Sequence, residues 1–469
     1  MEPLRDTPTG AIPLARSLGE YAAALAARAP DAALGAMRMY VLDTLAVMIA
    51  GSTSTSSRVV LRSLARADAQ GEATVAAAGR IASRTDAALI NGAYSHALEL
   101  DDDHRVAVLH PGAVVIPAAL AACEAQGTDG RTFLAAVLGG YEVMCRLGLV
   151  FRGSPFQHGL HPTAIFGVFG AATAAGIAMS LDGARMTHCL GIAGTQASGL
   201  TEWRADGSWI KRLHPGRAAH AGVLSAALAA EGFTGPATIL EGPGGFFTAF
   251  GHGEPMDTGV LLRDLGTYHH ALDTAIKPYP CCRFMHGALD LALDARAEGL
   301  DAAEIASVDI EIYETGVLTL HKTPMNAVDA QFNVPYGVAC ALKRGAVTLD
   351  DFTEQAVRDS ETLALCQQVN ARINHAYSAA YPDVYNVEMI LTLTSGERRR
   401  YHSTCPSGDP QAPAYAGKHA RLEQETDRKA ASLLAECGFP GTAELLQAAI
   451  RDLPQARNLD ALTSAVAAR

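Results

Sequence analysis

Charged side chains are scarce in this 469-residue sequence, in which Asp, Glu, Lys and Arg together account for only 18% of the residues. The formal net charge is −12, which argues against nucleic acid as the main partner. Hydrophobic residues make up 49% of the chain, so it is neither a disordered segment nor a charge-rich tail. An acidic protein can still bind an anionic small molecule, provided that the site gathers its own positive groups.

Aromatic residues are also few, at 6%, whereas alanine is abundant, which favours closely packed helices over an all-β fold. The N-terminal residues lack the basic and apolar regions of a secretory signal. The most apolar run, HPTAIFGVFGAATAAGIAMSL from His161, is rich in small residues and predicts a buried helix in preference to a membrane span. We therefore expect no membrane as a partner.

The cysteines lack any recognised spacing. There are nine, and they form no CxxC pair and no Cys/His pattern typical of a metal site. Adjacent Cys281 and Cys282 could not bond to each other without strain. The sequence thus predicts no metal site, no disulfide framework and a location in the reducing cytoplasm.

The spacing of apolar residues predicts a mainly helical protein. Residues 14–265 contain helix-like segments punctuated by Gly and Pro, and helices return after about residue 410. Between them, SVDIEIYE alternates like a strand and VEMILTLTSGERRRYHST resembles a β-hairpin. We expect a mainly α fold with an inserted α+β lid: a helical body from 1–272 and 405–469, and a lid from 273–404. A cleft between two such units is a common place for a small ligand.

The segment HALELDDDHRVAVLHPGAVV concentrates acidic and imidazole side chains between two predicted helices. Its chemically interesting members are Glu99, Asp101, Asp102, Asp103 and His110. Three successive aspartates repel one another, so at least one should have a raised pKa unless a cation lies nearby. The pattern fits an acid/base site, carboxylate binding of a divalent metal ion, or a solvated loop whose Asp caps the next helix. Spacing alone leaves these three interpretations open.

Two further segments carry histidines and cations. His161 precedes a very apolar helix, and the dipole of that helix would lower the pKa of His161. The imidazole could then act as a neutral proton shuttle, or it could simply cap the helix. In IKRLHPGRAAHAG, Lys211 and Arg217 lie among other basic residues. This cluster could bind a carboxylate, with Lys as a point charge and Arg as a fork, or could be a solvated basic face.

The segment KPYPCCRFMH places Lys277 and Arg283 around two prolines and the cysteine pair. Pro278 and Pro280 stiffen the chain and fix where Lys277 points. If a helix begins within residues 281–286, its free N–H groups add to the attraction for an anion. A second carboxylate-binding group is one interpretation, and a rigid turn with two buried thiols is the other.

Taken in order, these segments resemble the MmgE/PrpD family, which includes 2-methylcitrate dehydratase, cis-aconitate decarboxylase and iminodisuccinate epimerase. The likeness runs through LDTLAVMIAGS, NGAYSHALELDDDH, LHPGAVVIPA, GLHPTAIFG, IKRLHPGRAAHAG, KPYPCCRFMH and QFNVPYGVACAL, and so covers nearly the whole chain. The resemblance implies a helical domain built from both chain ends, an α+β lid and a homodimer. It also implies chemistry without a cofactor on small di- or tricarboxylates.

The resemblance and the basic segments together select candidate site residues. The expected catalytic residues are His110, His161, Lys211, Lys277 and Asp102. The expected substrate-binding residues are Glu99, Asp101, Arg217, Cys282, Arg283 and Tyr336, the last being the tyrosine of the family's late motif, here FNVPYGV.

Three positions depart from the family pattern. Asp103 stands where the family's DDT-like element has a threonine, and Glu99 stands where the dehydratase and the decarboxylase have an aspartate. Cys282 replaces a histidine that the decarboxylase carries five residues after the second lysine. Because that histidine is a candidate proton donor, its loss places a cis-aconitate-type decarboxylase lowest among the expected activities.

These observations predict a cofactor-independent lyase of the dehydratase type, acting on a small di- or tricarboxylate such as 2-methylcitrate. Lys211, Lys277 and Arg283 would stabilise the enediolate formed by α-proton abstraction. Either His161 or His110 would be the base. The alternative is an epimerase of an iminodisuccinate-like dicarboxylate, in which the proton returns to the opposite face. An iron–sulfur or metal-dependent lyase and a non-catalytic carboxylate-binding protein are rivals from other classes.

Overall fold

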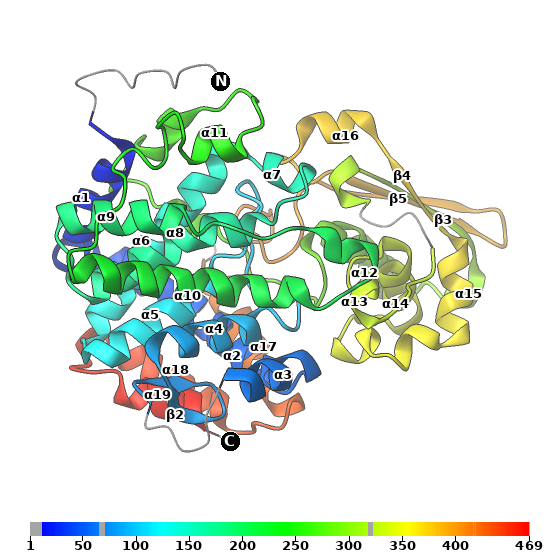
Figure 1. The fold of residues 1–469 in the computed structure, drawn as a ribbon. Helices are drawn as coiled ribbons and strands as arrows, with labels where there is room; N and C mark the ends of the chain where they lie inside the picture. Colours follow the sequence, from blue (N-terminus) through cyan, green and yellow to red (C-terminus); the bar gives the residue numbers. More distant parts are fainter. Residues whose placement is uncertain (1–11, 65–70, 318–321, 416, 418, 469) are drawn as a thin grey trace.

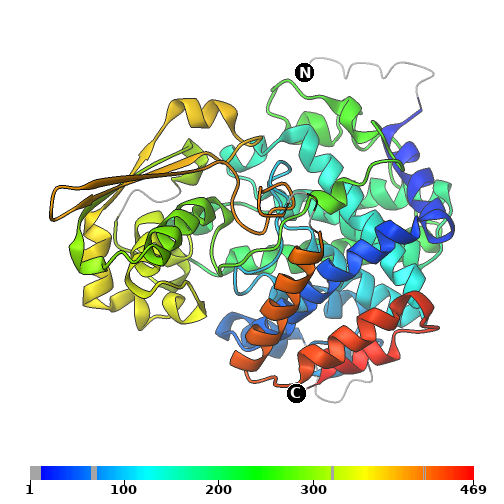
Figure 2. The ribbon, with the colours of Figure 1, turned by 180° about the vertical axis from the view of Figure 1, so that it is seen from behind.

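The computed structural model describes residues 12–64, 71–317, 322–415, 417 and 419–468. It is a mainly helical molecule with a small four-stranded mixed sheet (Figure 1). The first and last helices lie in the same part of the molecule, and the sheet with its helices projects to one side of that part (Figures 1 and 2). The expected mainly α fold with a smaller α+β unit is confirmed.

The body consists of helices from both ends of the chain. They are α1 (Leu14–Arg28), α2 (Asp31–Gly51), α3 (Thr55–Leu64), α4 (Arg84–Ser95), α5 (Gly112–Gln126), α6 (Gly130–Phe151), α7 (Ser154–Gln157), α8 (Pro162–Ala178), α9 (Gly183–Gly194), α10 (Ile210–Ala230), α11 (Phe246–Phe250), α17 (His419–Glu436), α18 (Thr442–Asp452) and α19 (Asp460–Ala467). Helix α8 packs against α5, α6, α9 and α10, and every one of its residues is buried. From the other end of the chain, α17 packs across α2 (Figure 2).

The crossing of α4 and α10 depends on two glycines. A Cβ added to Gly92 on α4 would lie 2.7 Å from the Cα of Gly216 on α10. A Cβ added to Gly216 would lie 2.2 Å from the carbonyl oxygen of Leu89. Only residues without a side chain let two backbones approach this closely. The crossing brings the start of α10, which carries Lys211, toward the end of α4, where the acidic segment begins.

The inserted part combines five helices with the four-stranded sheet. Its helices are α12 (His286–Ala297), α13 (Ala327–Ala330), α14 (Val334–Arg344), α15 (Ser360–Gln368) and α16 (His375–Ala380), and its strands are β3 (Ile305–Ile312), β4 (Val369–Ile373), β5 (Val387–Leu393) and β6 (Arg398–Ser403). The strand order is β4-β3-β5-β6, with β3 parallel to β4 and antiparallel to β5, and β5 antiparallel to β6. The predicted strand and hairpin are therefore confirmed.

Two large hydrophobic clusters contain most of the buried apolar side chains. One takes its residues from 15–276 and 412–466. The other is formed mainly by residues 281–393. It also includes three side chains from the body: Val108, Phe156 and Trp203. The lid thus packs directly on the body through these three side chains, while the boundaries assigned to the two units stay predictions.

Some features were not predicted from the sequence. A short hairpin of β1 (Ala73–Val75) and β2 (Gly79–Ala82) lies within the segment expected to be helical. Helices α2 and α6 are each long and apolar enough to cross a membrane, by length and composition alone. Their most apolar stretches are 72% and 94% buried inside the fold, and core helices of soluble proteins pass the same test.

A short ladder of backbone contacts joins the body to the lid. Asp103 and Ala275 exchange two backbone hydrogen bonds, of 2.9 and 2.7 Å. The next amide, that of Ile276, donates to the carbonyl oxygen of Gly408. Gly408 has a φ of +82°, and a Cβ there would lie 1.8 Å from the carbonyl oxygen of Ile276. This crossing fixes the course of the chain just before Lys277.

Gly408→Ala should therefore lower the free energy of unfolding more than Gly396→Ala does. Both glycines have a positive φ, +82° and +88°, so either change strains the backbone by about 1 kcal/mol. Nothing lies within 4 Å of a Cβ at Gly396, whereas at Gly408 the backbone must move, at a further cost of about 1–3 kcal/mol. Chemical denaturation of both variants measures the difference. Equal losses would show that the crossing does not constrain the junction.

Candidate active site

A small cavity lies between residues of the body and residues of the lid. It is lined by side chains of the acidic segment, the body and the lid: Glu99, Asp103, Val108, His110, Phe156, His161, Pro162, Thr163, Trp203, Lys211, Cys282, Arg283, Phe284 and Phe332. Its volume of about 40 Å³ has room for roughly three water molecules. One wall is apolar and aromatic, and the other carries charges and imidazoles. More than half of the sequence-predicted site residues line it.

The carboxylate of Glu99 is the centre of the polar wall. Lys211 donates through Nζ to Oε1, and the Nζ of Lys277 lies 3.8 Å from Oε2. Lys277 also donates to the backbone carbonyl oxygen of Glu99, at 3.1 Å. Glu99 has a φ of +55°, a left-handed conformation that is costly for a non-glycine residue and is found often at functional sites. The body and the segment leading into the lid thus each supply one ammonium group to the same buried carboxylate.

Burial and neighbouring charges shift the pKa values of these groups in opposite directions. Burial raises the pKa of Glu99, but the Lys211 ammonium and weaker neighbours outweigh it and lower the pKa to about 2. Burial lowers the pKa of Lys277, but Asp101 and Glu99 reverse this effect and raise it. Glu99 and Lys277 are therefore both charged at neutral pH, although both side chains are buried.

His96, which the sequence analysis did not select, lies behind this wall. Its Nδ1 is 2.7 Å from Oδ2 of Asp101, and both side chains are fully buried. Its ring packs against those of His110 and His161, with centroids 5.1 and 5.6 Å apart. Asp101, expected to bind substrate, instead orients a histidine and does not line the cavity. The position of His96, three residues before Glu99, is the signal that could have found it.

Two of the predicted histidines face the cavity as neutral imidazoles. The Nδ1 of His110 lies 2.7 Å from the backbone carbonyl oxygen of Asp102, so Nδ1 carries the proton and Nε2 the lone pair. Burial, with Lys277, lowers the pKa of His110 well below its usual value. His161 occupies the N-cap position of α8, with Nδ1 3.1 Å from Nδ1 of His214. Burial, followed by His214, lowers the pKa of His161 in the same way.

Asp102, expected to be catalytic, lies outside the cavity in the core of the body. Its Oδ1 accepts a hydrogen bond from the amide of Gly112, and its Oδ2 accepts one from the hydroxyl of Tyr141, at 2.9 and 2.7 Å. Burial raises its pKa well above the usual value, against the effect of the Tyr141 hydrogen bond. Asp102 joins the acidic segment to α5 and α6 through these two bonds, and its expected catalytic role stays a prediction.

Two other predicted residues also lie away from the cavity. Arg217 follows Lys211 on α10 by six residues, which turns the two side chains about 120° apart around the helix, and Arg217 is exposed. Tyr336 lies in the lid core, 1% exposed, with its hydroxyl donating to the backbone carbonyl oxygen of Asp351. Neither side chain lines the cavity, and their expected part in substrate binding stays a prediction.

Cys282 and Arg283 reach the cavity from the lid side. Arg283 is 2% exposed and donates to the carbonyl oxygens of Ser407 and Pro406. Its Nε has no hydrogen-bond partner among the residues that the structure describes. Burial raises the pKa of the Cys282 thiol to about 11, so the thiol is protonated at neutral pH. Arg283 can therefore offer a donor to a ligand, whereas Cys282 is a small neutral lining group.

The opposite wall of the cavity is aromatic. The rings of Trp203 and Phe332 pack on each other, with centroids 4.7 Å apart. The Nζ of Lys211 lies 5.6 Å from the ring centre of Trp203 and 5.1 Å from that of Phe332, within the range of a cation–π contact. The Nε1 of Trp203 has no partner among the described residues. This wall suits the hydrocarbon part of a small acid.

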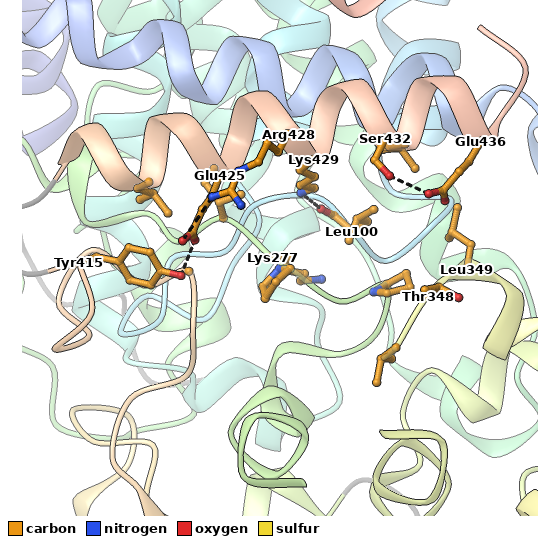
Figure 3. Close-up of a pocket in the computed structure, with 17 residues that line it drawn as sticks. Leu100, Lys277, Thr348, Leu349, Tyr415, Glu425, Arg428, Lys429, Ser432 and Glu436 are labelled. Atoms are coloured by element: carbon orange, nitrogen blue, oxygen red, sulfur yellow. Dashed lines mark hydrogen bonds and ion pairs between the residues drawn. The ribbon is translucent and has the colours of Figure 1, made fainter. Parts of the chain in front are cut away.

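A larger cavity of about 410 Å³ lies beneath α17, and Lys277 is among the residues that line it (Figure 3). Its polar side chains are largely paired with one another or with the backbone. Lys429 donates to the carbonyl oxygen of Leu100, and Tyr415 donates to Glu425 (Figure 3). Lys277 therefore lines this larger cavity and not the small one, whose lining it contacts through Glu99.

Cysteines and acidic residues are not arranged around a metal ion. All nine cysteines are free. Across the described ranges of the chain, no group of three His, Cys, Asp or Glu side chains is placed to hold one. The acidic segment instead directs its carboxylates at ammonium groups, imidazoles and backbone amides.

The fold and the cavity together define a two-part, mainly helical protein with a closed site that carries buried cations and neutral imidazoles. A family model described as MmgE/PrpD N-terminal domain matches residues 16–258, and one described as MmgE/PrpD C-terminal domain matches residues 279–434. The chain therefore belongs to the MmgE/PrpD family.

Several proteins of known activity are similar to this chain. The cis-aconitate decarboxylase of Aspergillus terreus is 29% identical over 347 residues, covering 69% of this chain and 70% of that protein. The cis-aconitate decarboxylase-like protein oryM of Aspergillus oryzae is 27% identical, covering 69% and 71%. The human cis-aconitate decarboxylase is 27% identical, covering 66% of each. With the family match, these relationships show an enzyme of the lyase type.

Replacing Glu99 by Gln should destabilise the protein strongly, because two buried ammonium groups lose their carboxylate. The expected loss is about 3–5 kcal/mol. Glu397→Gln, which breaks the exposed pair with Arg399, is the control and should cost less than about 1 kcal/mol. Urea denaturation of the three proteins measures both values, and similar losses would contradict the central place given to Glu99.

The contribution of Glu99 to the free energy of unfolding should also depend on pH, and it should decrease in acid. A carboxyl group whose pKa is lowered by folding stabilises the fold above its unfolded pKa of about 4.5. That contribution is lost as the pH falls through the folded value of about 2. The difference in stability between wild type and Glu99→Gln should therefore be constant from about pH 5 to 8 and shrink below about pH 4.5. A difference that grows with acidity would refute this assignment.

Proposed function

We propose that the protein is a cofactor-independent lyase of the dehydratase type, acting on a small hydroxylated di- or tricarboxylate. The observation that carries the proposal is the meeting of Lys211 and Lys277 at one buried carboxylate, beside neutral imidazoles. In a site of this kind, fixed cations stabilise negative charge far better than they do in water. The similar proteins named above, cis-aconitate decarboxylases, support a polycarboxylate as the substrate.

The difficult step is removal of a proton next to a carboxylate, because it creates an enediolate with two negative charges. Lys211 lines the cavity and can exchange its contact with Glu99 for a substrate carboxylate, while Lys277 continues to hold Glu99 in place. Arg283 offers its unpartnered Nε to the same anion. These donors are already in position before the charge develops, which is what lowers the barrier.

His110 has the features of the base. Its Nδ1 proton is held by the carbonyl oxygen of Asp102, so the lone pair on Nε2 is free to take the α-proton. His161 pairs with His214 and is the alternative base. Loss of a β-hydroxyl from the resulting anion gives an alkene and water, which is the dehydratase outcome.

Decarboxylation is the second candidate, because the similar proteins are named cis-aconitate decarboxylases. Loss of carbon dioxide forms a comparable anion, and the same cations would stabilise it. The neutral thiol of Cys282, with a pKa of about 11, is a weaker proton donor than the histidine expected at that position. This difference is why we place dehydration first.

The small volume of the cavity bears on how a substrate enters. A space of about 40 Å³ cannot hold a di- or tricarboxylate, so we expect the lid to move away from the body before binding. Closure would then remove water from around the anion. A homodimeric assembly and a cytoplasmic location stay part of the proposal, the first from the family resemblance and the second from the cysteine content.

A panel of acids in heavy water, followed by NMR, tests the reaction type. Malate, citramalate, citrate, 2-methylcitrate and cis-aconitate are incubated separately with the enzyme. A new alkene signal indicates dehydration, and deuterium uptake without net loss of the acid indicates epimerisation. Release of carbon dioxide from cis-aconitate indicates decarboxylation. No reaction and no deuterium uptake with any of these acids would contradict the proposal.

Lys211→Met should lower kcat/KM for the substrate found in this way by about 100- to 1000-fold, because a preorganised donor to the enediolate is lost. Lys343→Met is the control, since Lys343 pairs with Asp359 on the lid surface and should leave the rate unchanged. Steady-state kinetics on folded proteins measures both. An unchanged rate for Lys211→Met would remove that residue from the mechanism.

A further inference from the structure

Asp103 is a cavity-lining carboxylate to which the mechanism above gives no role. Its backbone is fixed by the two hydrogen bonds with Ala275, and its side chain is 6% exposed. Its Oδ2 has no hydrogen-bond partner among the described residues. A buried acceptor without a partner, on the wall of a ligand cavity, is costly unless a ligand or a proton meets it.

The surroundings of Asp103 allow it to hold a proton. Its Oδ1 lies 3.6 Å from Nδ1 of His110. The Nη1 and Nη2 groups of Arg283 donate to carbonyl oxygens of the lid junction, and Lys277 donates to the carbonyl oxygen of Glu99. The titratable and charged groups that face it come from the acidic segment, the junction and the lid: Asp101, His110, Lys277, Arg283, Tyr313, Tyr381, Tyr385 and Asp409.

We propose that Asp103 is the general acid of the reaction, donating its proton to the hydroxyl group that leaves the substrate. This inference rests on the dehydratase activity proposed above and accounts for its second step, the departure of the hydroxyl group. His110 Nε2 takes the α-proton, and the electron pair of that C–H bond is held in the enediolate that Lys211 stabilises. Collapse of the enediolate then forms the new C–C π bond. The C–O bond breaks with its pair on oxygen, which takes the proton of Asp103 and leaves as water. Between turnovers His110 returns a proton to solvent and Asp103 takes one back.

The protonation states of the two cavity carboxylates fit this division of roles. Burial raises the pKa of Asp103 to about 6, against the lowering effects of Arg283 and Lys277. Glu99, with a pKa of about 2, is ionised throughout the neutral range. A general acid works best when its pKa lies near the working pH. Asp103 meets that condition and Glu99 does not.

Charge balance in the site favours the same assignment. The polar wall and the groups directly behind it carry three cations and three carboxylates: Lys211, Lys277, Arg283, Glu99, Asp101 and Asp103. With Asp103 protonated, one positive charge is left uncompensated for an incoming carboxylate. An anionic substrate therefore favours the protonated form of Asp103, and its binding should take up protons.

Asp103→Asn should abolish dehydration while sparing abstraction of the α-proton. We expect kcat to fall about 100-fold or more with little change in KM, because an acid is lost and the cations stay. Deuterium exchange at the α-carbon should persist, since Lys211 and His110 are untouched. Wild-type kcat/KM should fall as the pH rises through about 6, and the variant should lose this dependence. Asp383→Asn, in the exposed pair with Arg152, is the control and should match wild type.

A substrate whose leaving group needs no proton separates acid catalysis from a structural role. The β-fluoro analogue of the acid chosen by the panel loses fluoride directly, so Asp103→Asn should process it within about tenfold of wild type. Equal slowing with both substrates would show a structural role and overturn the inference, as would normal dehydration by the variant. Wild-type enzyme that neither forms an alkene nor exchanges an α-proton with any acid would overturn the proposed function, and this inference with it.

Discussion

The buried charges around Glu99 are the constraint on which the rest of the structure depends. Lys277, Glu99 and Lys211 are only 0%, 2% and 5% exposed. Removing each such charge from water costs several kcal/mol, so each must meet an opposite charge with good geometry. The fold draws these partners from the end of α4, the start of α10 and the crossing into the lid. The close approach of α4 to α10 and the backbone ladder at the junction both serve to bring them together.

The site lies at the contact between body and lid, where its charges can act on a bound substrate. Val108, Phe156 and Trp203 join the lid core to the body and wall off one side of the cavity. Exclusion of water strengthens every electrostatic interaction inside. The cavity of about 40 Å³ is too small for a di- or tricarboxylate, which is why the proposed function includes a movement of the lid. Lys277 links the junction to the site, because its backbone directly follows the ladder and its ammonium group donates to the carbonyl oxygen of Glu99.

Local patterns were enough to predict much of this molecule, because helices, the strand β3 and the β5–β6 hairpin each leave a periodic signal. Ordered motifs located most of the cavity residues. Which of the remaining side chains reach the cavity depends on the three-dimensional fold and not on the local sequence. Arg217 resembles Lys211 in sequence, yet the helix turns it to solvent. The hydroxyl of Tyr336 is taken by the lid itself. His96 gained its significance only when folding placed it against Asp101.

The central claim is that two lysines share one buried carboxylate and stay charged there. NMR of protein labelled with ¹⁵N at the lysine Nζ tests it most directly. The account predicts two ammonium signals at neutral pH that exchange slowly with solvent, assigned by their loss in variants at Lys211 and Lys277. Addition of a dicarboxylate should shift the Lys211 signal the most. Signals that exchange as fast as those of surface lysines, or that lose their protons near neutral pH, would contradict it.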